Sequence, residues 1–217
     1  MRDNRDNCLV LNGRQVQVAV PVDHSLSFDV GEDGTRKRTL PIQMGVMHWT
    51  AAENPAARVH ETLHARGLSI HFILDRDGAI YQCADPALVV CSHAGRGVND
   101  ISWGVEIVNY GGVAKGHRPP VKGADRERYE CVIHGHKRLC ADFYPAQYTA
   151  IWELFDAVHR ELGIPRGVYA GESTLVRWPQ LRKFRGAIGH FHAALKKTDP
   201  GVRPLEWLAK RWAERPL

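Results

Sequence analysis

Two histidines and one aspartate in this sequence are of the types that hold a hydrolytic metal ion. A catalytic zinc centre takes three protein ligands from His, Asp/Glu and Cys, and its open position binds a water whose pKa falls to about 7. His48, His190 and Asp199 could supply the three ligands. The chain contains 12 histidines, however, and most protein histidines lie at the surface or in hydrogen-bonded core positions, so residue type alone does not select this set.

The predicted elements around these residues would bring them together. Residues 41–50, PIQMGVMHWT, predict a buried strand with His48 at its end. Residues 185–201, RGAIGHFHAALKKTDPG, predict a strand that leads into a loop, with His190 and Asp199 on either side of that loop. Two distant parts of the chain would then converge at one edge of a sheet.

Strand and helix patterns alternate along the rest of the chain. They predict, in order, one or two strands with a polar hairpin or loop in 1–40, a helix in 51–67, a two-strand hairpin in 68–83, a β-branched strand in 103–111, an irregular excursion in 111–145, a helix in 145–163 and a short helix in 204–217. This mixture indicates an α/β (α+β) fold, a single domain with a central mixed β-sheet flanked by helices. We expect residues 1–40 to be an N-terminal extension packed on a domain formed by residues 41–217.

Length and composition restrict the class of protein. A chain of 217 residues, of which 44% are hydrophobic and 24% charged, fits one globular domain. Its apolar runs end well short of the about 20 residues that a membrane-spanning helix needs, so we expect no transmembrane segment. The N-terminus lacks the continuous apolar stretch of a secretory signal, which predicts cytoplasmic synthesis and reduced thiols for the five cysteines.

The net charge of +5 favours polyanionic partners, among them nucleic acid, anionic membranes and anionic cell walls. No aromatic and basic strand motif and no helix-turn-helix pattern accompanies the charge, so we do not expect a nucleic-acid partner. The predicted C-terminal helix combines large apolar and basic residues, and could make weak contact with an anionic outer membrane. These residues are Trp207, Lys210, Arg211, Trp212 and Arg215. A helix packed on the core with a solvated basic face is the alternative.

Four segments resemble, in order, the landmark segments of a known family. They are MHWTAAE (47–53), HFILDRDGAIYQ (71–82), SHAGRGVNDISWGVEIVN (92–109) and IGHFHAALKKTDPG (188–201). The family is that of the zinc-dependent N-acetylmuramoyl-L-alanine amidases, with phage amidase endolysins, anhydromuropeptide-recycling amidases and peptidoglycan recognition proteins among its members. The last segment is the most specific, because a His after Ile-Gly is followed closely by Lys-Thr-Asp-Pro-Gly. The resemblance implies that the domain of residues 41–217 is the amidase catalytic domain.

The resemblance also assigns roles to individual residues. It implies that His48, His190 and Asp199 hold one zinc ion. Lys197 matches the family lysine beside the metal, whose ammonium would stabilise the oxyanion of a tetrahedral intermediate. Glu106 matches the family's acidic residue in the strand after the HAG loop, where a carboxylate could act as general base. The alternatives are a solvated loop lysine and a strand glutamate that faces solvent or an arginine.

Three further residues match positions that could line a substrate groove. His93 and Asn99 lie in the segment around HAG, where structural hydrogen bonds in a tight loop are the alternative. His71 could be a groove residue or lie behind the ligands. The loop between His190 and Asp199 resembles a family loop that is one residue longer, which leaves His192 as a rival ligand.

The function implied by the resemblance is hydrolysis of the amide between the lactyl group of N-acetylmuramic acid and L-alanine. Peptidoglycan or muropeptides would be the partners. A phage or prophage endolysin that acts on the cell wall after release is expected, with a cytosolic recycling amidase or a non-catalytic peptidoglycan-binding module as alternatives. A glycosidase would need two carboxylates that flank a sugar bond, and the sequence offers no such pair.

The predicted excursion of residues 111–145 contains a second cluster of metal-ligand types. Cys131, His134, His136 and Cys140 lie within ten residues. Their spacing matches no standard zinc finger, and two histidines on so short a span would strain a tetrahedral site. We therefore do not assign a structural zinc ion to this segment.

Overall fold

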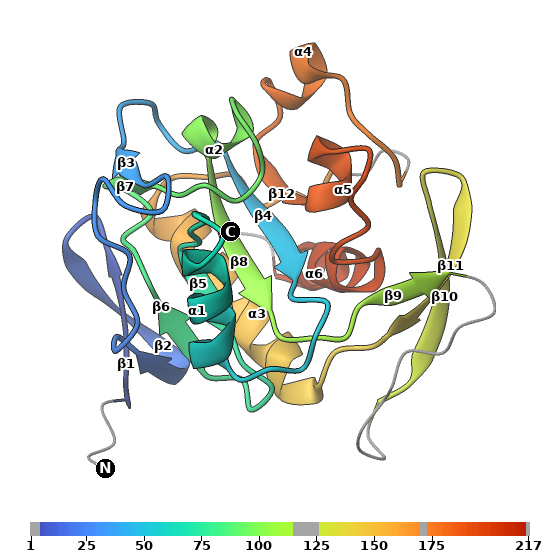
Figure 1. The fold of residues 1–217 in the computed structure, drawn as a ribbon, viewed down its shortest axis with the longest axis horizontal. Coiled ribbons are helices and arrows are strands. Elements are labelled where there is room, and N and C mark those ends of the chain that lie inside the picture. The colour runs from blue at the N-terminus through green and yellow to red at the C-terminus, as the bar shows by residue number, and fades with distance from the viewer. Residues whose placement is uncertain (1–4, 115–125, 170–172, 216–217) are drawn as a thin grey trace.

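A seven-stranded sheet runs through the centre of the molecule in the computed structural model (Figure 1), which describes residues 5–114, 126–169 and 173–215. The strands are β1 Arg5–Leu11, β2 Arg14–Asp23, β3 Arg36–Lys37, β4 Met44–Trp49, β5 Phe72–Leu74, β6 Ile80–Gln82, β7 Val89–Val90, β8 Ser102–Ile107, β9 Gly112–Ala114, β10 Arg128–Ile133, β11 His136–Ala141 and β12 Gly186–Gly189. The helices are α1 Ala56–His64, α2 Val98–Ile101, α3 Pro145–Glu161, α4 Trp178–Leu181, α5 His190–Ala193 and α6 Arg203–Glu214.

The main sheet is mixed, with the strand order β1-β2-β6-β5-β8-β4-β12. β5, β8, β4 and β12 run parallel to one another, whereas β1 with β2 and β5 with β6 form antiparallel pairs. Since ligands of open parallel sheets bind outside the carboxyl ends of the strands, the ends of β4, β8 and β12 are where a site is expected. This is the single domain with a mixed sheet and flanking helices that the sequence predicts.

The two faces of the sheet pack against different helices because strand side chains alternate between them. On β4, Met47 and Trp49 join the large core that includes side chains of α3 and α6, which lie behind the sheet in Figure 1. Met44 and Val46 join a smaller core on the opposite face, together with residues of α2 and α4. His48 shares the alternation of Met44 and Val46, so its ring lies on the face away from α3 and α6.

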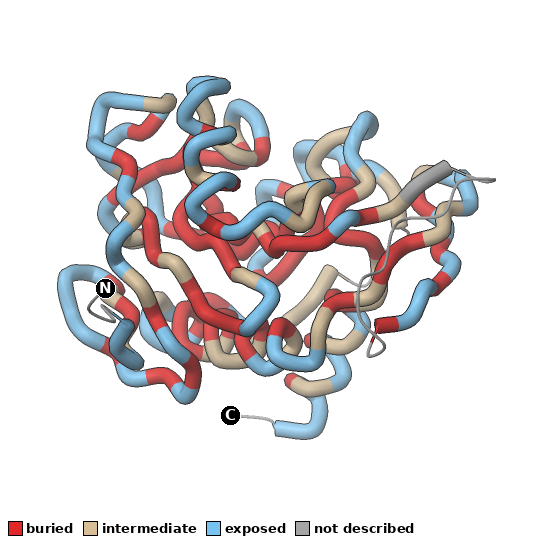
Figure 2. The backbone as a smooth tube through the Cα atoms, turned by 60° about the horizontal axis from the view of Figure 1, so that its bottom comes forward, coloured by how far each residue is buried: buried red, intermediate tan, exposed pale blue. Residues whose placement is uncertain are grey.

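The buried backbone follows the central strands, and exposed loops surround it (Figure 2). The N-terminal segment contributes β1 and β2 to the same sheet, and β2 pairs in parallel with β6 through Val22 and Ile80. In the part of the chain that the structure describes, no helix is both long and apolar enough to cross a membrane.

Most predicted elements are confirmed, but the prediction of an irregular excursion in 111–145 is wrong for its described residues. β9, β10 and β11 form a separate three-stranded antiparallel sheet. β10 alternates between exposed and buried residues, as a strand with one covered face does. The tight turn between β10 and β11 has positive φ at His134 (53°) and Gly135 (77°), which is the backbone of a two-residue hairpin. Residues 115–125 of the segment lie outside the described residues.

The buried ring of His159 should make the stability of the fold depend on pH. His159 lies on α3 with 1% of its surface exposed, and its Nδ1 donates to the carbonyl of Pro165 at 3.2 Å. Burial lowers its pKa to about 4. In the unfolded chain, the same histidine has a pKa of about 6.5. Between about pH 6.5 and pH 4 the unfolded chain is therefore protonated at this residue while the folded protein is not, so the free energy of unfolding falls as the pH falls through this window. A shift of this size corresponds to about 3 kcal/mol.

Urea unfolding at pH 7 and at pH 4.5 measures this effect. The His159→Leu protein, which cannot titrate at this position, should lose less stability between the two pH values than the unsubstituted protein does. His136→Ala, which removes an exposed histidine, serves as the control and should keep the original pH dependence. Equal pH dependence in the His159→Leu and unsubstituted proteins would contradict the prediction.

Candidate active site

Three side-chain atoms converge at the carboxyl ends of β4 and β12. His48 Nδ1 lies 2.9 Å from His190 Nδ1 and 3.1 Å from Asp199 Oδ2, and His190 Nδ1 lies 2.9 Å from the same oxygen. The three residues are 1%, 5% and 7% exposed. Among the described residues, they form a group of metal-ligand types that could hold an ion. The structure thus brings together all three residues for which a zinc-ligand role is predicted.

This group fits a tetrahedral metal ion. Two ring nitrogens that face each other at 2.9 Å cannot both carry a proton, so at least one lone pair points into the triangle. Zinc–ligand bonds of about 2.0–2.1 Å at tetrahedral angles separate ligand atoms by about 3.3–3.4 Å, which is close to the spacing found here. Two imidazoles and one carboxylate also leave a fourth position for water, as catalytic zinc sites do.

The parallel pairing of β4 and β12 explains why residues 142 positions apart meet. It sets Gly189, the last residue of β12, beside Met47 of β4. One further step along each strand direction brings His190 next to His48. A short loop brings Asp199 back beside His190, and the backbone N–H of Phe191 in α5 donates to the Asp199 carbonyl at 3.2 Å.

A directed chain of hydrogen bonds fixes the tautomer of His48. Ser102 Oγ donates to the carbonyl of Val98 at 2.7 Å, so its oxygen accepts from His93 Nε2, 3.3 Å away. A neutral His93 must then accept at Nδ1, and His48 Nε2, at 3.1 Å, is the donor. The lone pair of His48 is therefore on Nδ1, the atom that faces the other two ligand-type side chains.

The environment holds these groups in the protonation states that bind a metal. Burial, with the neighbouring His190, lowers the pKa of His48 to about 4. Burial also lowers the pKa of His93 well below its usual value, and His48 adds to the effect. Burial alone would raise the pKa of Asp199, but the neighbouring rings of His190 and His48 outweigh burial and hold that pKa below its usual value. His48 and His93 are therefore neutral at pH 7, beside an ionised Asp199 carboxylate.

Glu106 stands beside His48 on the neighbouring strand. The parallel register of β4 and β8 pairs the two residues directly, on the same face of the sheet. The Oε2 atom of Glu106 is buried and has no hydrogen-bond partner among the described residues. Burial, and secondarily the charge of Asp199, raises the pKa of Glu106 well above its usual value. A buried carboxylate with a free oxygen and a raised pKa is suited to accept a proton.

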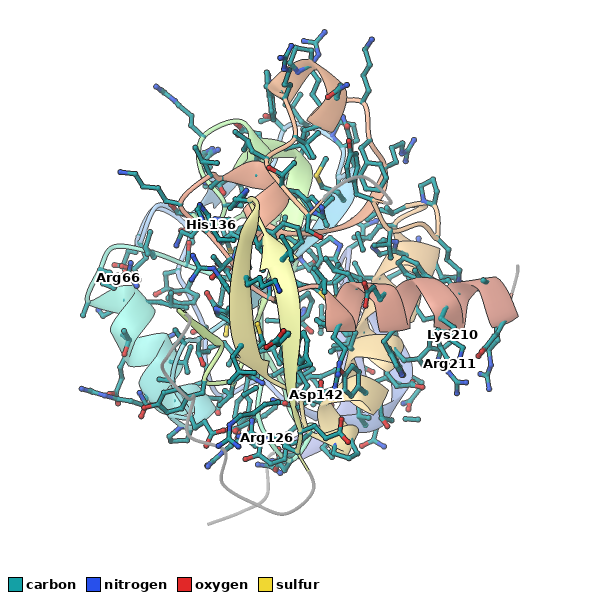
Figure 3. The ribbon with its side chains drawn as sticks, turned by 90° about the vertical axis from the view of Figure 1, so that its right-hand side faces the viewer. Arg66, Arg126, His136, Asp142, Lys210 and Arg211 are labelled. Carbon is teal, nitrogen blue, oxygen red and sulfur yellow. The ribbon has the colours of Figure 1, made fainter. Side chains whose placement is uncertain are left out.

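A pocket of about 120 Å³ opens next to the Glu106 carboxylate. The loop after β4 and the helix α1 form its walls, and its lining combines apolar and polar side chains. The lining residues are Thr50, Ala52, Asn54, Val59, Thr62, Leu63, Arg66 and Glu106. Arg66, at the end of α1 in Figure 3, is the cation of this lining. The pocket therefore offers room, and one positive charge, beside the candidate proton acceptor.

Lys197 lies in the exposed loop between α5 and Asp199. The positive charge of its ammonium lowers the pKa of both His48 and Glu106, although less than burial changes either pKa. The ammonium therefore lies near both side chains. A cation that sits beside the candidate metal site and remains open to solvent can reach a substrate oxygen at that site.

The structure places the other predicted residues behind the site. The ring of His71 is fully buried, accepts from the backbone N–H of Gly104 at Nδ1 and donates to the carbonyl of Val89 at Nε2, so both nitrogens are engaged. Asn99 Oδ1 accepts from two backbone N–H groups of the loop at residues 93–94. As placed, the His71 ring joins β7 to β8, and the Asn99 amide holds the loop that carries His93.

His192 lies apart from the ligand triangle. Its Nδ1 accepts from the backbone N–H of Gly189 at 3.1 Å, and its ring stacks near Phe191 and Tyr169. The structure therefore points to His190, and not to its rival His192, as the residue that faces His48.

Two site residues were not predicted from the sequence. Ser102 ends the hydrogen-bond chain that orients His48, although its sequence segment predicts roles only for His93, Asn99 and Glu106. His134 belongs to the cluster of Cys131, His136 and Cys140, to which no metal ion is assigned, yet its ring reaches the backbone carbonyl of Lys197 at 2.9 Å. The contacts of Ser102 with His93 and of His134 with Lys197 leave no signal in the sequence, because each joins two separate segments of the chain.

Comparison with known proteins identifies a family and a shared fold. Residues 38–202 match the family described as N-acetylmuramoyl-L-alanine amidase. A search of curated proteins gave no significant match. Among solved structures, the chain is similar to the endolysin amidase LysCS from Clostridium intestinale, with 18% identity, a TM-score of 0.53, and coverage of 87% of this chain and 94% of that one.

Two further structures share the fold. The E. coli amidase AmiD, solved with an anhydromuropeptide substrate, has 21% identity and a TM-score of 0.53, over 94% of this chain and 65% of that one. AMPDH3 from Pseudomonas aeruginosa has 19% identity and a TM-score of 0.50, over 85% of this chain and 65% of that one. Since the matched region covers most of the sequence, from β4 through the Asp199 loop, the chain belongs to the N-acetylmuramoyl-L-alanine amidase family.

Proposed function

We propose that this protein is a zinc-dependent amidase that hydrolyses the bond between the lactyl group of N-acetylmuramic acid and L-alanine in peptidoglycan. The observation that carries the proposal is the buried triangle of His48, His190 and Asp199, with Glu106 beside it, whose buried Oε2 has no hydrogen-bond partner among the described residues. Membership of the amidase family supports the reaction and the substrate class. A module that only bound peptidoglycan would have no need of a free, buried carboxylate next to three ligand-type side chains.

Zinc held by the three residues would supply Lewis acidity, which makes a carbonyl carbon more electrophilic and water more acidic. The protein's own groups supply the rest of the mechanism. Glu106 accepts a proton from the attacking water at its free oxygen, and returns that proton to the departing alanine amine. His93 and Ser102 hold the ring of His48 in one orientation through their hydrogen-bond chain. Water is the nucleophile, so no serine or cysteine is needed.

Lys197 stabilises the negative charge that develops on the scissile carbonyl oxygen. This interaction strengthens in the transition state, so its loss should appear in kcat more than in KM. We expect Lys197→Ala to lower kcat by about 10² to 10³-fold. The neighbouring Lys196→Ala, which removes an equally exposed charge, should change kcat little. Initial rates of L-alanine amine release from a muramyl peptide measure both, and equal effects of the two substitutions would contradict the role.

We propose a phage or prophage endolysin as the setting, made in the cytoplasm and active on the wall after release. The net charge of +5 supports it, because an anionic wall attracts a basic enzyme. A cytosolic recycling amidase is the second candidate, since it would meet the same bond in anhydromuropeptides.

Contact of α6 with the outer membrane would be weak at most. Lys210 and Arg211 lie on this helix (Figure 3), but Arg211 pairs with Glu214 at 3.4 Å and Arg215 lies over the ring of Trp152. Part of the basic surface is therefore engaged within the protein, which reduces the charge that remains for lipid.

Digestion of purified peptidoglycan, with and without a zinc chelator, tests the reaction. New N-terminal alanines that disappear with chelator are expected, and mass spectrometry identifies the chain ends. New reducing sugar ends would indicate a glycosidase, and bound protein on intact wall would indicate a recognition module. Faster cleavage of intact sacculi than of anhydromuropeptide monomers is the result expected of an endolysin, and the reverse order favours a recycling enzyme.

A further inference from the structure

The hairpin of β10 and β11 contacts the loop that carries Lys197 and Asp199. Figure 3 shows this hairpin upright, with His136 at its tip end, Arg126 and Asp142 near its base, and the segment that contains α5 beside the tip. The hairpin belongs to the second, three-stranded sheet and contributes none of the ligand-type residues of the triangle. Its contacts with the loop therefore need an explanation other than metal binding.

The ring of His134 joins two segments at the tip of this hairpin. Its Nε2 lies 2.9 Å from the carbonyl oxygen of Lys197, which can only accept, so Nε2 is the donor. In a neutral ring Nδ1 then accepts, and the hydroxyl of Thr174 lies 3.3 Å from it. The backbone N–H of His134 donates to the carbonyl of Ser173 at 2.8 Å. Three hydrogen bonds thus fix His134 between residues 173–174 and Lys197.

Apart from the Asp199 carboxylate at the triangle, the Lys197 loop bonds through its backbone mainly within itself and to α5. The backbone N–H of Lys197 donates to Ala194, that of Gly201 donates to Thr198, and Asp199 accepts from α5. These bonds do not tie the loop to a separate part of the chain, whereas the His134 bond does. The base of the hairpin makes a second contact, because the Tyr129 hydroxyl packs so closely on Gly201 that a Cβ there would lie 2.4 Å from it.

We infer that His134 is a positioning residue, which acts through its hydrogen bond to the Lys197 carbonyl and holds the Lys197 ammonium at the site. A lysine side chain has many rotamers, and a fixed backbone is what limits the volume that its ammonium explores. The inference rests on the proposed role of Lys197 in catalysis. It assigns a function to the hairpin, which the amidase chemistry by itself does not require.

Substitution of His134 separates this role from a general structural one. His134→Ala removes both hydrogen bonds of the ring, and loss of the one to the Lys197 carbonyl should lower kcat by about five- to tenfold, with KM nearly unchanged. His134→Gln keeps a donor that can reach the Lys197 carbonyl and should restore most of the rate. Both variants place a Cβ at the same positive φ, so backbone strain does not distinguish them. His136→Ala, in the same turn, is the matched control.

A double substitution shows whether His134 acts through Lys197. In a Lys197→Ala background, His134→Ala should cause no further loss of kcat, because the group that it positions is gone. The zinc affinity of His134→Ala, measured by competition with a chromogenic chelator, should stay within about twofold of the original. An equal additional loss in the double variant, or zinc binding weakened in step with kcat, would overturn the inference.

Amide hydrogen exchange tests, independently of activity, whether the hydrogen bond from His134 holds the Lys197 loop. His134→Ala should speed exchange at the amides of Lys197 and Gly201, while His134→Gln and His136→Ala leave it nearly unchanged. Unaltered exchange in His134→Ala would show that His134 does not hold the Lys197 loop, even if the enzyme is an amidase. Failure of the amidase proposal is a different result, namely no alanine ends from peptidoglycan with zinc present, and it leaves the exchange prediction intact.

Discussion

Removal of zinc with a chelator should abolish hydrolysis, and one zinc ion per chain should restore it. The expected loss is the whole measurable rate, because His48, His190 and Asp199 are buried together and offer no substitute for the Lewis acid. The ion should also stabilise the fold, since it binds the native state, by about 4 kcal/mol when its concentration is a thousand times the dissociation constant. Metal analysis, thermal unfolding and rates of alanine release measure the three effects on one preparation.

Substitution of a ligand should reproduce the effect of the chelator. Asp199→Asn keeps the size of the side chain but removes its charge, so we expect zinc binding to weaken greatly and activity to fall below detection. His192→Gln is the matched control, because His192 is also buried and lies two residues from His190 but outside the triangle. Retention of zinc and activity in Asp199→Asn, or loss of zinc in His192→Gln, would refute the ligand set.

Glu106→Gln should separate catalysis from metal binding. The substitution keeps the shape of the side chain and removes the proton acceptor, so kcat should fall by about 10² to 10⁴-fold. Zinc content should remain at one per chain, because Glu106 is outside the triangle. KM should change little if substrate binding does not depend on the charge.

Stability gives an independent check on Glu106. Burial raises the pKa of Glu106 in the folded state. Above the pKa of the unfolded chain, the folded state therefore binds more protons than the unfolded state, so the free energy of unfolding falls as the pH rises. At pH 7 the buried carboxylate thus destabilises the metal-free protein. Glu106→Gln should therefore raise the free energy of unfolding of the metal-free protein while it lowers kcat. Glu130→Gln, at an exposed position of β10, should alter neither quantity. A kcat within threefold of the original would remove Glu106 from the mechanism.

The central strands of the sheet were predictable because their signals are local. A run such as Met44–Trp49, buried along its length, indicates a strand in the interior of a sheet, and α3 carries apolar residues at helical intervals. The strands within residues 111–145 lack such a clear local signal. The hairpin of β10 and β11 has a His-Gly turn where Asn-Gly or Asp-Gly is the usual signal.

The candidate ligands came from the resemblance to the amidase family, and their types and places in the sequence were sufficient to name His48, His190 and Asp199. The sequence by itself also determined the alternation that puts His48 on one face of its strand, since that follows from local backbone geometry. Only the tertiary structure decided which atoms meet. The parallel register of β4 with β8 and β12 sets Glu106 and His190 beside His48.

The same holds for the residues behind the ligands. The His93–Ser102 chain that orients His48, and the His134 contact with Lys197, depend on how separate loops and sheets pack. A sequence pattern reports the periodicity within one element, whereas these contacts are set by the distances between elements. That is why chemistry could be assigned to residue types before the fold was known, and why the positions and protonation states of those residues could not.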